Sequence, residues 1–231
     1  MTRRIRAVLF DRDDTLSVTD PAVYQAAADW VAGRFGLDAG LVHRALLRQW
    51  HEAFGNWWAL RTLEDERVFW RRYGRELGGA LGLSDVQGEA IVAQFPYQAF
   101  MKAAPGAREL LRTLRSRGLK IGVLSNTLPD IWPTLHATAL GEYVDVALSS
   151  CALGIHKPDP AAFELAAQAL GVGADAVLFL DDKQENVDAA RQVGMTAALV
   201  DLEGRAPGAI SDLGDVVALL DGLEAAAGEP G

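Results

Sequence analysis

The stretch IRAVLFDRDDTL, residues 5–16, carries the strongest structural signal in the chain. Its first half, Ile5–Phe10, has the length and apolar character of a strand that is buried on both faces of a parallel sheet. Its second half turns acidic, with aspartates at positions 11, 13 and 14. A buried strand that ends in carboxylates is typical of a sheet whose carboxyl edge holds a ligand site.

Further apolar runs of similar length predict the rest of the sheet. They are Leu119–Leu124, Ala176–Leu180 and Thr196–Val200, with a weaker run at Val144–Leu148. Helical patterns at Ala107–Arg117, Ala161–Leu170 and Gln184–Val193 lie between these runs. Strands that alternate with helices predict an α/β fold with a doubly wound, Rossmann-like parallel sheet.

The segment between the first run and this α/β part is helical and rich in Trp, Arg and Ala. Its predicted helices are Pro21–Phe35, Ala39–Phe54, Thr62–Leu81 and Ser84–Gln98. We expect residues 17–100 to form an α-helical cap inserted into a core of residues 1–16 and 101–223. A flexible tail is expected over residues 224–231.

Composition restricts the class of function. A chain of 231 residues, of which 50% are hydrophobic, suits one core with a small accessory domain. The net charge of −9 argues against nucleic acid or an anionic membrane as a partner. Acidic residues from Asp11 onward interrupt any N-terminal signal segment, so we expect a cytoplasmic protein. The single Cys151 excludes an internal disulfide, and the sequence permits either a monomer or a homodimer.

Polar side chains follow the predicted strands. They are Asp11 and Asp13 after the first run, Ser125 and Asn126 after the second, Asp181 and Asp182 after the third, and Lys157 ahead of a predicted helix. Carboxyl ends of parallel strands share one edge of the sheet, so these side chains should converge there. At about 4 Å and an effective dielectric near 20, each carboxylate pair repels by roughly 4 kcal/mol. Either protons or a divalent cation must relieve that repulsion, and oxygen ligands without His or Cys favour Mg²⁺. With Lys157 and the neutral donors, the set predicts a phosphoryl-binding site.

These four segments resemble, in order, the four motifs of the haloacid dehalogenase-like superfamily, over residues 7–193. Asp11-x-Asp13-x-Thr15 is similar to the nucleophile motif, and Ser125, Lys157 and Asp181-Asp182 mark the other three. A helical insertion between the first two motifs is similar to the C1-capped branch of that family.

The resemblance implies a Mg²⁺-dependent phosphatase that acts on a small phosphorylated metabolite. Asp11 would be the nucleophile that becomes an aspartyl-phosphate, and Asp13 the general acid and base. The metal would be held by Asp11, the Asp13 carbonyl and Asp182, with Asp181 behind them. Lys157 would compensate negative charge, and Ser125 with Asn126 would bind the phosphoryl group. Thr15 would brace the nucleophile loop.

Other interpretations stay open at this point. Each motif alone is explained by a turn, a helix cap or a surface lysine. A sugar-phosphate mutase would share the aspartyl-phosphate, a haloacid dehalogenase would attack carbon without metal, and a non-catalytic binding protein could keep the fold. In the cap, aromatic residues are expected mostly to pack and in part to grip an apolar or sugar-like substrate. Cap arginines are candidates for a second anionic group of the substrate: Arg44, Arg48, Arg61 and Arg67.

Overall fold

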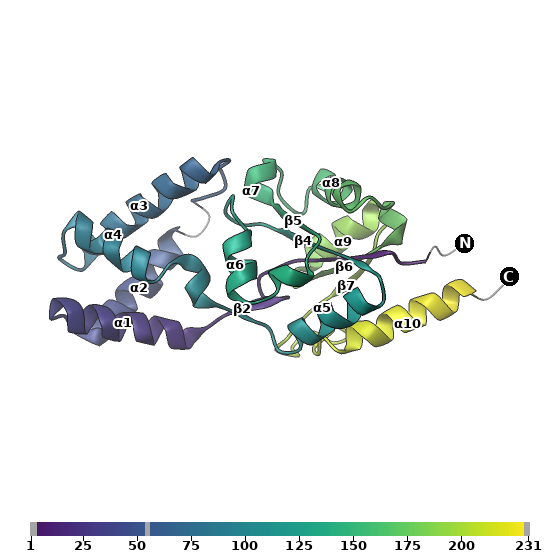
Figure 1. The fold of residues 1–231 in the computed structure, drawn as a ribbon, viewed down its shortest axis with the longest axis horizontal. Helices are drawn as coiled ribbons and strands as arrows, with labels where there is room; N and C mark the ends of the chain where they lie inside the picture. Colours follow the sequence, from purple (N-terminus) through teal and green to yellow (C-terminus); the bar gives the residue numbers. More distant parts are fainter. Residues whose placement is uncertain (1–3, 54–55, 229–231) are drawn as a thin grey trace.

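The computed structural model describes residues 4–53 and 56–228, and its centre is a five-stranded parallel sheet (Figure 1). The strand order is β5-β4-β1-β6-β7. The strands are β1 (Ala7–Phe10), β4 (Lys120–Ser125), β5 (Val146–Ser149), β6 (Val177–Asp181) and β7 (Thr196–Leu199). The predicted parallel sheet is therefore confirmed, the weakest run included. β1 lies in the middle and pairs with β4 and β6, so the acidic loop after it leaves the centre of the sheet.

Side chains of β1 alternate between two apolar layers, as the period of a strand requires. The helices that cover the sheet are α5 (Ala107–Ser116), α6 (Trp132–Ala137), α8 (Pro160–Leu170), α9 (Gln184–Gln192) and α10 (Asp215–Gly228), with the short α7 (Ser150–Leu153) after β5. Val8 and Phe10 join the cluster under α5, α6 and α10, whereas Ala7 and Leu9 join the cluster under α8 and α9. Because all four β1 residues are fully buried, the strand is held rigidly below the acidic loop.

Among the described residues, four α-helices lie in the chain between β1 and Tyr97 and form the left half of Figure 1. They are α1 (Pro21–Phe35), α2 (Ala39–Ala53), α3 (Leu63–Ala80) and α4 (Asp85–Gln94), followed by the 3-10 turn η1 (Tyr97–Phe100). They share a separate apolar cluster, which also takes in Leu128 and Cys151 of the core. The connection to the sheet is a two-stranded antiparallel ribbon, β2 (Ser17–Thr19) with β3 (Met101–Ala103). No sequence signal had suggested this ribbon, because three-residue strands are too short to show a period.

Helix α3 and helix α4 approach each other closely through glycines. A Cβ atom on Gly88 would overlap the carbonyl of Gly74, and one on Gly78 would lie 3.0 Å from the Ser84 carbonyl oxygen. Ser84 caps α4 in a capping box with Gln87. Three glycines thus allow the backbones of these helices to touch.

Two expectations differ from the structure. The predicted helix Ser84–Gln98 ends at Gln94, because Pro96 disfavours helical backbone in the residue before it and cannot donate a hydrogen bond. The predicted tail over 224–231 is helical as far as Gly228, since alanine is the best helix former and α10 simply continues. Residues 229–231 and Phe54 lie outside the described residues. Among the helices that are described, none has the length and apolar character needed to cross a membrane.

Candidate active site

Three of the predicted site residues stand at the ends of adjacent strands. Asp11 follows β1, Ser125 ends β4, and Asp181 ends β6. Because β4 and β6 flank β1, these residues meet at one edge of the sheet. Lys157 reaches the same edge from the loop ahead of α8. The structure thus brings together residues that lie far apart in the chain.

Lys157 is the electrostatic centre of this edge. Its Nζ donates to Asp11 Oδ1 at 2.6 Å and to Asp181 Oδ2 at 2.5 Å, and its side chain is 1% exposed. Burial opposes its charge, but the two carboxylates outweigh burial and raise the pKa of Lys157. Burial raises the pKa of Asp11 to about 8; Lys157 counteracts this rise, and Asp181 and Asp13 add to it. The charge of Lys157 alone therefore does not offset the effects of burial, Asp181 and Asp13 on the ionised form of Asp11.

Asp181 is completely buried, and both of its oxygens have partners in the chain. The backbone N–H of Lys183 donates to Oδ1 at 2.9 Å, and Asn186 Nδ2 donates to Oδ1 and Oδ2 at 2.9 and 3.0 Å. With Lys157 on Oδ2 as well, Asp181 is positioned to hold the lysine rather than to face a ligand. The expected role of Asp181 behind the metal ligands stays a prediction.

The residue that sequence reasoning missed is Arg12. Its guanidinium is fully buried and donates to Asp13 twice, from Nε to Oδ1 at 2.9 Å and from Nη2 to Oδ2 at 2.7 Å. Nη2 also donates to the Tyr97 hydroxyl at 2.8 Å and to Thr127 Oγ1 at 2.9 Å. The available signal was its position, since Arg12 is the sole cation inside the acidic stretch of residues 11–14.

The expected crowding of four carboxylates is therefore relieved in part by the protein itself. Lys157 lies between Asp11 and Asp181, and Arg12 binds the carboxylate of Asp13. Charge compensation by Lys157 was an expectation from the resemblance, whereas the ion pair of Arg12 with Asp13 was not anticipated. Two buried basic side chains carry part of the compensation.

Two of the predicted phosphoryl-site residues are engaged differently from expectation. The Asn126 carboxamide pairs with the backbone of Lys157: Nδ2 donates to the carbonyl at 2.8 Å and Oδ1 accepts from the N–H at 2.9 Å. Asn126 therefore positions the lysine loop. The Thr15 hydroxyl is buried, is not part of the cavity lining and has no hydrogen-bond partner among the described residues, so its expected role in bracing the loop stays a prediction. Ser125 is buried but lines the cavity, as expected of a phosphoryl donor.

The donor set suits Mg²⁺. Among the residues that the structure describes, no three acidic, His or Cys side chains are grouped as metal ligands. Asp11 and Asp182 both line the cavity, and Mg²⁺ typically takes one or two carboxylates together with other oxygens. Burial, followed by the charge of Asp181, raises the pKa of Asp182 to about 6. Asn186 adds a buried Oδ1 that lacks a donor within the described chain.

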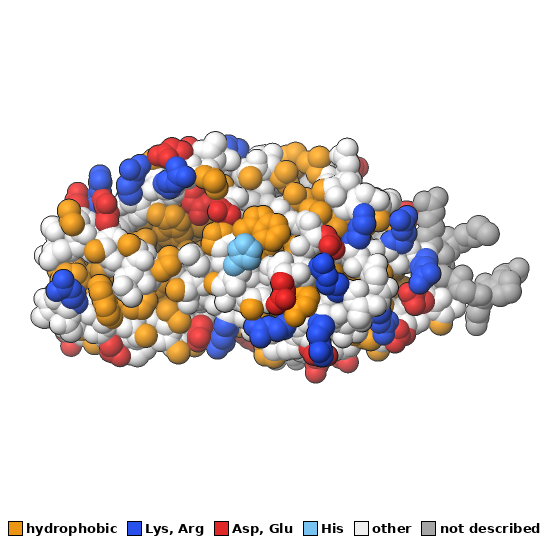
Figure 2. Space-filling view, in the orientation of Figure 1, with side chains coloured by type: hydrophobic (Ala, Val, Ile, Leu, Met, Phe, Trp, Pro, Cys, Tyr) orange, Lys and Arg blue, Asp and Glu red, His pale blue; other side chains and the backbone are white. Residues whose placement is uncertain are grey.

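These groups open into one cavity of about 310 Å³, which lies between the sheet edge and the cap. The core supplies its charged lining residues, which are Asp11, Asp13, Asp14, Lys157, Asp182 and Lys183. The cap supplies aromatic ones, which are Tyr24, Trp50, Trp57, Trp70, Tyr73, Phe95, Tyr97 and Phe100. On the face drawn in Figure 2, hydrophobic side chains gather in the hollowed surface over the cap. Several cap aromatic residues thus line this cavity, and their contact with a substrate stays a prediction.

The four cap arginines do not line this cavity. Arg61 Nη1 donates to the carbonyls of Trp58 and Leu60 at 2.7 and 2.8 Å, and Arg67 pairs with Glu64 at 2.8 Å. Arg44 and Arg48 are likewise absent from its lining. The suggestion that these side chains bind a second anionic group finds no geometric basis in the described chain.

Comparison with known proteins gives consistent matches. Residues 5–194 match the family of haloacid dehalogenase-like hydrolases. The chain is 37% identical to "Phosphatase MT3486" of Mycobacterium tuberculosis, over 94% of this chain and 98% of that protein. It is 31% identical to a phosphoserine phosphatase of Thermus thermophilus, over 85% and 89%. It is 28% identical to (S)-2-haloacid dehalogenase 4A of Burkholderia cepacia, over 90% and 87%.

Solved structures share the fold. A phosphatase crystal structure from Thermococcus onnurineus superposes with a TM-score of 0.63 at 23% identity, covering 94% of this chain and 99% of that one. At that identity the likeness concerns the arrangement of helices and strands alone.

Proposed function

Because this chain belongs to the haloacid dehalogenase-like hydrolase family, we propose that it is a Mg²⁺-dependent phosphatase of small phosphate monoesters, with Asp11 as nucleophile. The observation that carries the proposal is the buried pair of Asp11 Oδ1 and Lys157 Nζ, 2.6 Å apart, at the base of a cavity that Asp13 and Ser125 also line. A carboxylate beside a fixed cation and a hydroxyl donor suits attack on a phosphoryl group.

In the first step, an Asp11 oxygen attacks phosphorus and the bond from phosphorus to the alcohol oxygen breaks. Asp13 gives its proton to that departing oxygen, so the alcohol leaves neutral and Asp11 carries the phosphoryl group. Lys157 offsets the negative charge of the phosphoryl oxygens, while the Ser125 hydroxyl donates to one of them.

In the second step, water attacks phosphorus and the bond from phosphorus to Asp11 breaks. Asp13, now a carboxylate, takes the proton of that water, which restores both aspartates and releases inorganic phosphate. The exposure of the Asp13 side chain, 37%, leaves it accessible from the cavity for both proton transfers.

Asp11, Asp182 and the main-chain carbonyl of Asp13 would hold Mg²⁺, which supplies positive charge to the phosphoryl oxygens when bound. The raised pKa values of Asp11 and Asp182, both due first to burial, support this part of the proposal. We further propose that residues 17–100 act as the cap of a C1-capped enzyme.

The test is phosphate release from p-nitrophenyl phosphate and a panel of metabolite phosphates, with Mg²⁺ and with excess chelator. We expect turnover that the chelator abolishes. Asp11→Asn should remove turnover by a factor of about 10⁴ or more, and circular dichroism should show that the variant is still folded. Asp188→Asn is the matched control, since exposed Asp188 of α9 bonds Gln184 and Arg191 and does not line the cavity. Full activity of the Asp11→Asn protein would refute the assigned nucleophile.

The relatives also include proteins named as dehalogenases, which makes the product a necessary readout. Halide release from a 2-haloacid, unaffected by chelator, would favour a dehalogenase instead. Asp13 and Asp182 count against that alternative, because attack on carbon needs neither a proton donor nor a metal. Accumulation of a sugar bisphosphate without free phosphate would favour a phosphomutase.

A further inference from the structure

The cavity has a charged end and an uncharged end. Its charged lining residues all belong to the core, and among the described lining residues the cap contributes none. The two core lysines are already opposed by acids: Lys157 lies between Asp11 and Asp181, and Lys183 acts on Asp14 and Asp182. The part of a ligand that extends from Asp11 into the cap therefore contacts uncharged lining residues.

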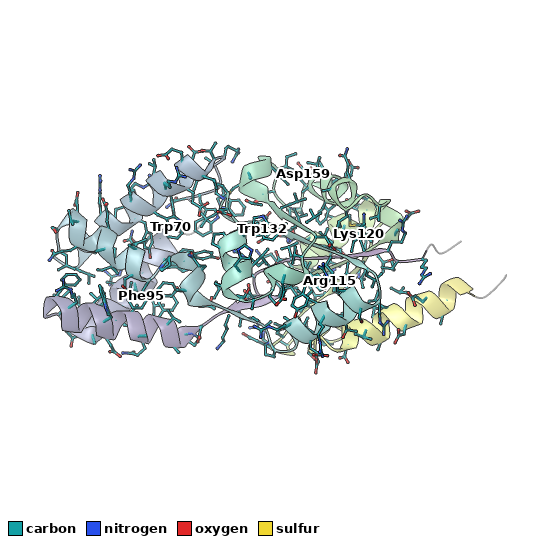
Figure 3. The ribbon with its side chains drawn as sticks, in the orientation of Figure 1. Trp70, Phe95, Arg115, Lys120, Trp132 and Asp159 are labelled. Carbon is teal, nitrogen blue, oxygen red and sulfur yellow. The ribbon has the colours of Figure 1, made fainter. Side chains whose placement is uncertain are left out.

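The wall of the uncharged end is a set of aromatic rings. Trp50 and Trp70 are nearly parallel, at 5° with centroids 6.5 Å apart, and Tyr97 lies within 25° of both at 5.2 and 6.0 Å. Trp57 stacks on Trp50 at 5.4 Å and 26°. Figure 3 places Trp70 among the cap helices, and Trp70 lines the cavity. Such rings bury flat apolar groups well and hold them in a defined orientation.

The polar groups of this end are neutral. Burial raises the pKa values of Tyr24 and Tyr73, so both remain phenols at physiological pH. Both tyrosines line the cavity. They can bond a hydroxyl or carbonyl of a ligand, but they offer no compensation to a second charge.

Resting on the proposed function, we infer that the substrate is a phosphate monoester of an uncharged, largely apolar, ring-containing alcohol. A carboxylate or second phosphate on that alcohol would be desolvated among these rings, which disfavours binding. Arg12 reaches the Tyr97 hydroxyl but does not line the cavity, and its guanidinium is already bound to Asp13. The cavity of about 310 Å³ is at the small end of ligand pockets, which suits an alcohol of one or two rings.

The test compares benzyl phosphate and naphthylmethyl phosphate with phosphoglycolate. All three are esters of alkyl alcohols, so the inherent ease of losing the alcohol does not set the order. We expect kcat/KM for naphthylmethyl phosphate to exceed that for phosphoglycolate by about a hundredfold or more, with benzyl phosphate between them. Phosphoglycolate as good as either aromatic ester would overturn the inference and leave the proposed phosphatase activity intact.

Variants of Trp50 test whether the aromatic wall produces the preference for aromatic esters over phosphoglycolate. Trp50→Ala should lower kcat/KM for naphthylmethyl phosphate about tenfold, mainly through KM, and leave phosphoglycolate turnover within about twofold. Trp50→Leu repeats the test with less loss of volume, and thermal unfolding shows that each variant is folded. Trp132→Ala is the matched control, because Trp132 lies on α6 of the core and is 37% exposed (Figure 3). Equal losses for both esters in Trp50→Ala, or no loss in either Trp50 variant, contradict the inference.

Calorimetry on the Asp11→Asn protein separates the two hypotheses. If no ester is hydrolysed, the proposed function fails, and binding alone reports on the cavity. Naphthylmethyl phosphate that binds at least tenfold more tightly than phosphoglycolate supports the apolar site, and the reverse order refutes it.

Discussion

The guanidinium of Arg12 holds the carboxylate of Asp13 in a fork, with hydrogen bonds of 2.9 and 2.7 Å. The same guanidinium reaches Tyr97 at the end of the cap and Thr127 of the core. Asp13, the proposed acid and base, is thus tied to both walls of the cavity through one buried side chain. Arg12 is a positioning residue, because it touches Asp13 and lies beneath the cavity lining.

Replacing Arg12 should impair the proton transfer assigned to Asp13. Arg12→Met keeps an unbranched side chain but removes the two hydrogen bonds to Asp13 and those to Tyr97 and Thr127, and Arg12→Lys keeps the charge without the planar fork. We expect kcat for an alkyl phosphate to fall by about 10²-fold, within the range that general acid catalysis contributes. With p-nitrophenyl phosphate, whose leaving group needs little protonation, the loss should be below about tenfold. A purely structural role would lower both rates equally, which would contradict this assignment.

We expect Asn126 to affect activity by positioning Lys157 rather than by binding the phosphoryl group. Asn126→Ala removes two hydrogen bonds to the Lys157 backbone, and each is worth about 1 kcal/mol. The expected result is a loss of roughly 1–3 kcal/mol in the free energy of unfolding and a kcat about tenfold lower. Urea unfolding and steady-state rates measure the two effects. Asn56→Ala is the control, since exposed Asn56 donates to the nearby Glu52 carbonyl; an Asn126→Ala protein that behaves like this control would disprove the role.

Gly88 should tolerate no side chain. In Gly88→Ala the new Cβ meets the Gly74 carbonyl, so α3 and α4 must move apart at a cost of about 1–3 kcal/mol in the free energy of unfolding. Gly79→Ala in α3 meets no atom within 4 Å and should be neutral or stabilising by up to ~1 kcal/mol. Urea unfolding of the two variants gives the comparison. Equal stability of both would contradict the close helix contact.

Cys151 should report on contact between cap and core. Burial raises the pKa of its thiol to about 11, and its Sγ donates to the Trp57 carbonyl of the cap at 3.3 Å. At pH 8 the thiolate fraction should be roughly two hundredfold below that of a free cysteine with pKa near 8.5. Iodoacetamide should therefore react slowly in the folded protein, rapidly in urea, and more slowly still with a cavity ligand bound.

The raised pKa of Cys151 also makes the stability of the folded protein depend on pH. Because the folded-state pKa of the Cys151 thiol is raised, its contribution to stability is fully present below pH 8.5 and is lost as the pH rises toward 11. Rapid alkylation at pH 8 under native conditions would show that the thiol is not enclosed.

The sheet and the meeting of its terminal acids were predictable from residues alone. Ile5–Phe10 and its counterparts are uninterrupted apolar runs, and a parallel sheet puts the residue after each run at one edge whatever the details. Asp11, Ser125 and Asp181 therefore follow from local pattern plus topology. Helix limits such as Ser84, Gly36 and Pro160 were equally readable, because capping is a local property.

Contacts between side chains of distant segments were not predictable. That Arg12 binds Asp13 and Tyr97, or that Asn126 pairs with the Lys157 backbone, depends on rotamers chosen when separate elements pack. The aromatic lining that the cap gives to the cavity was unpredictable for the same reason. Aromatic residues at helical spacing look alike in the sequence whether they fill a core or line a cavity. Local periodicity specifies which face of an element is apolar, and the assembled fold specifies what that face meets.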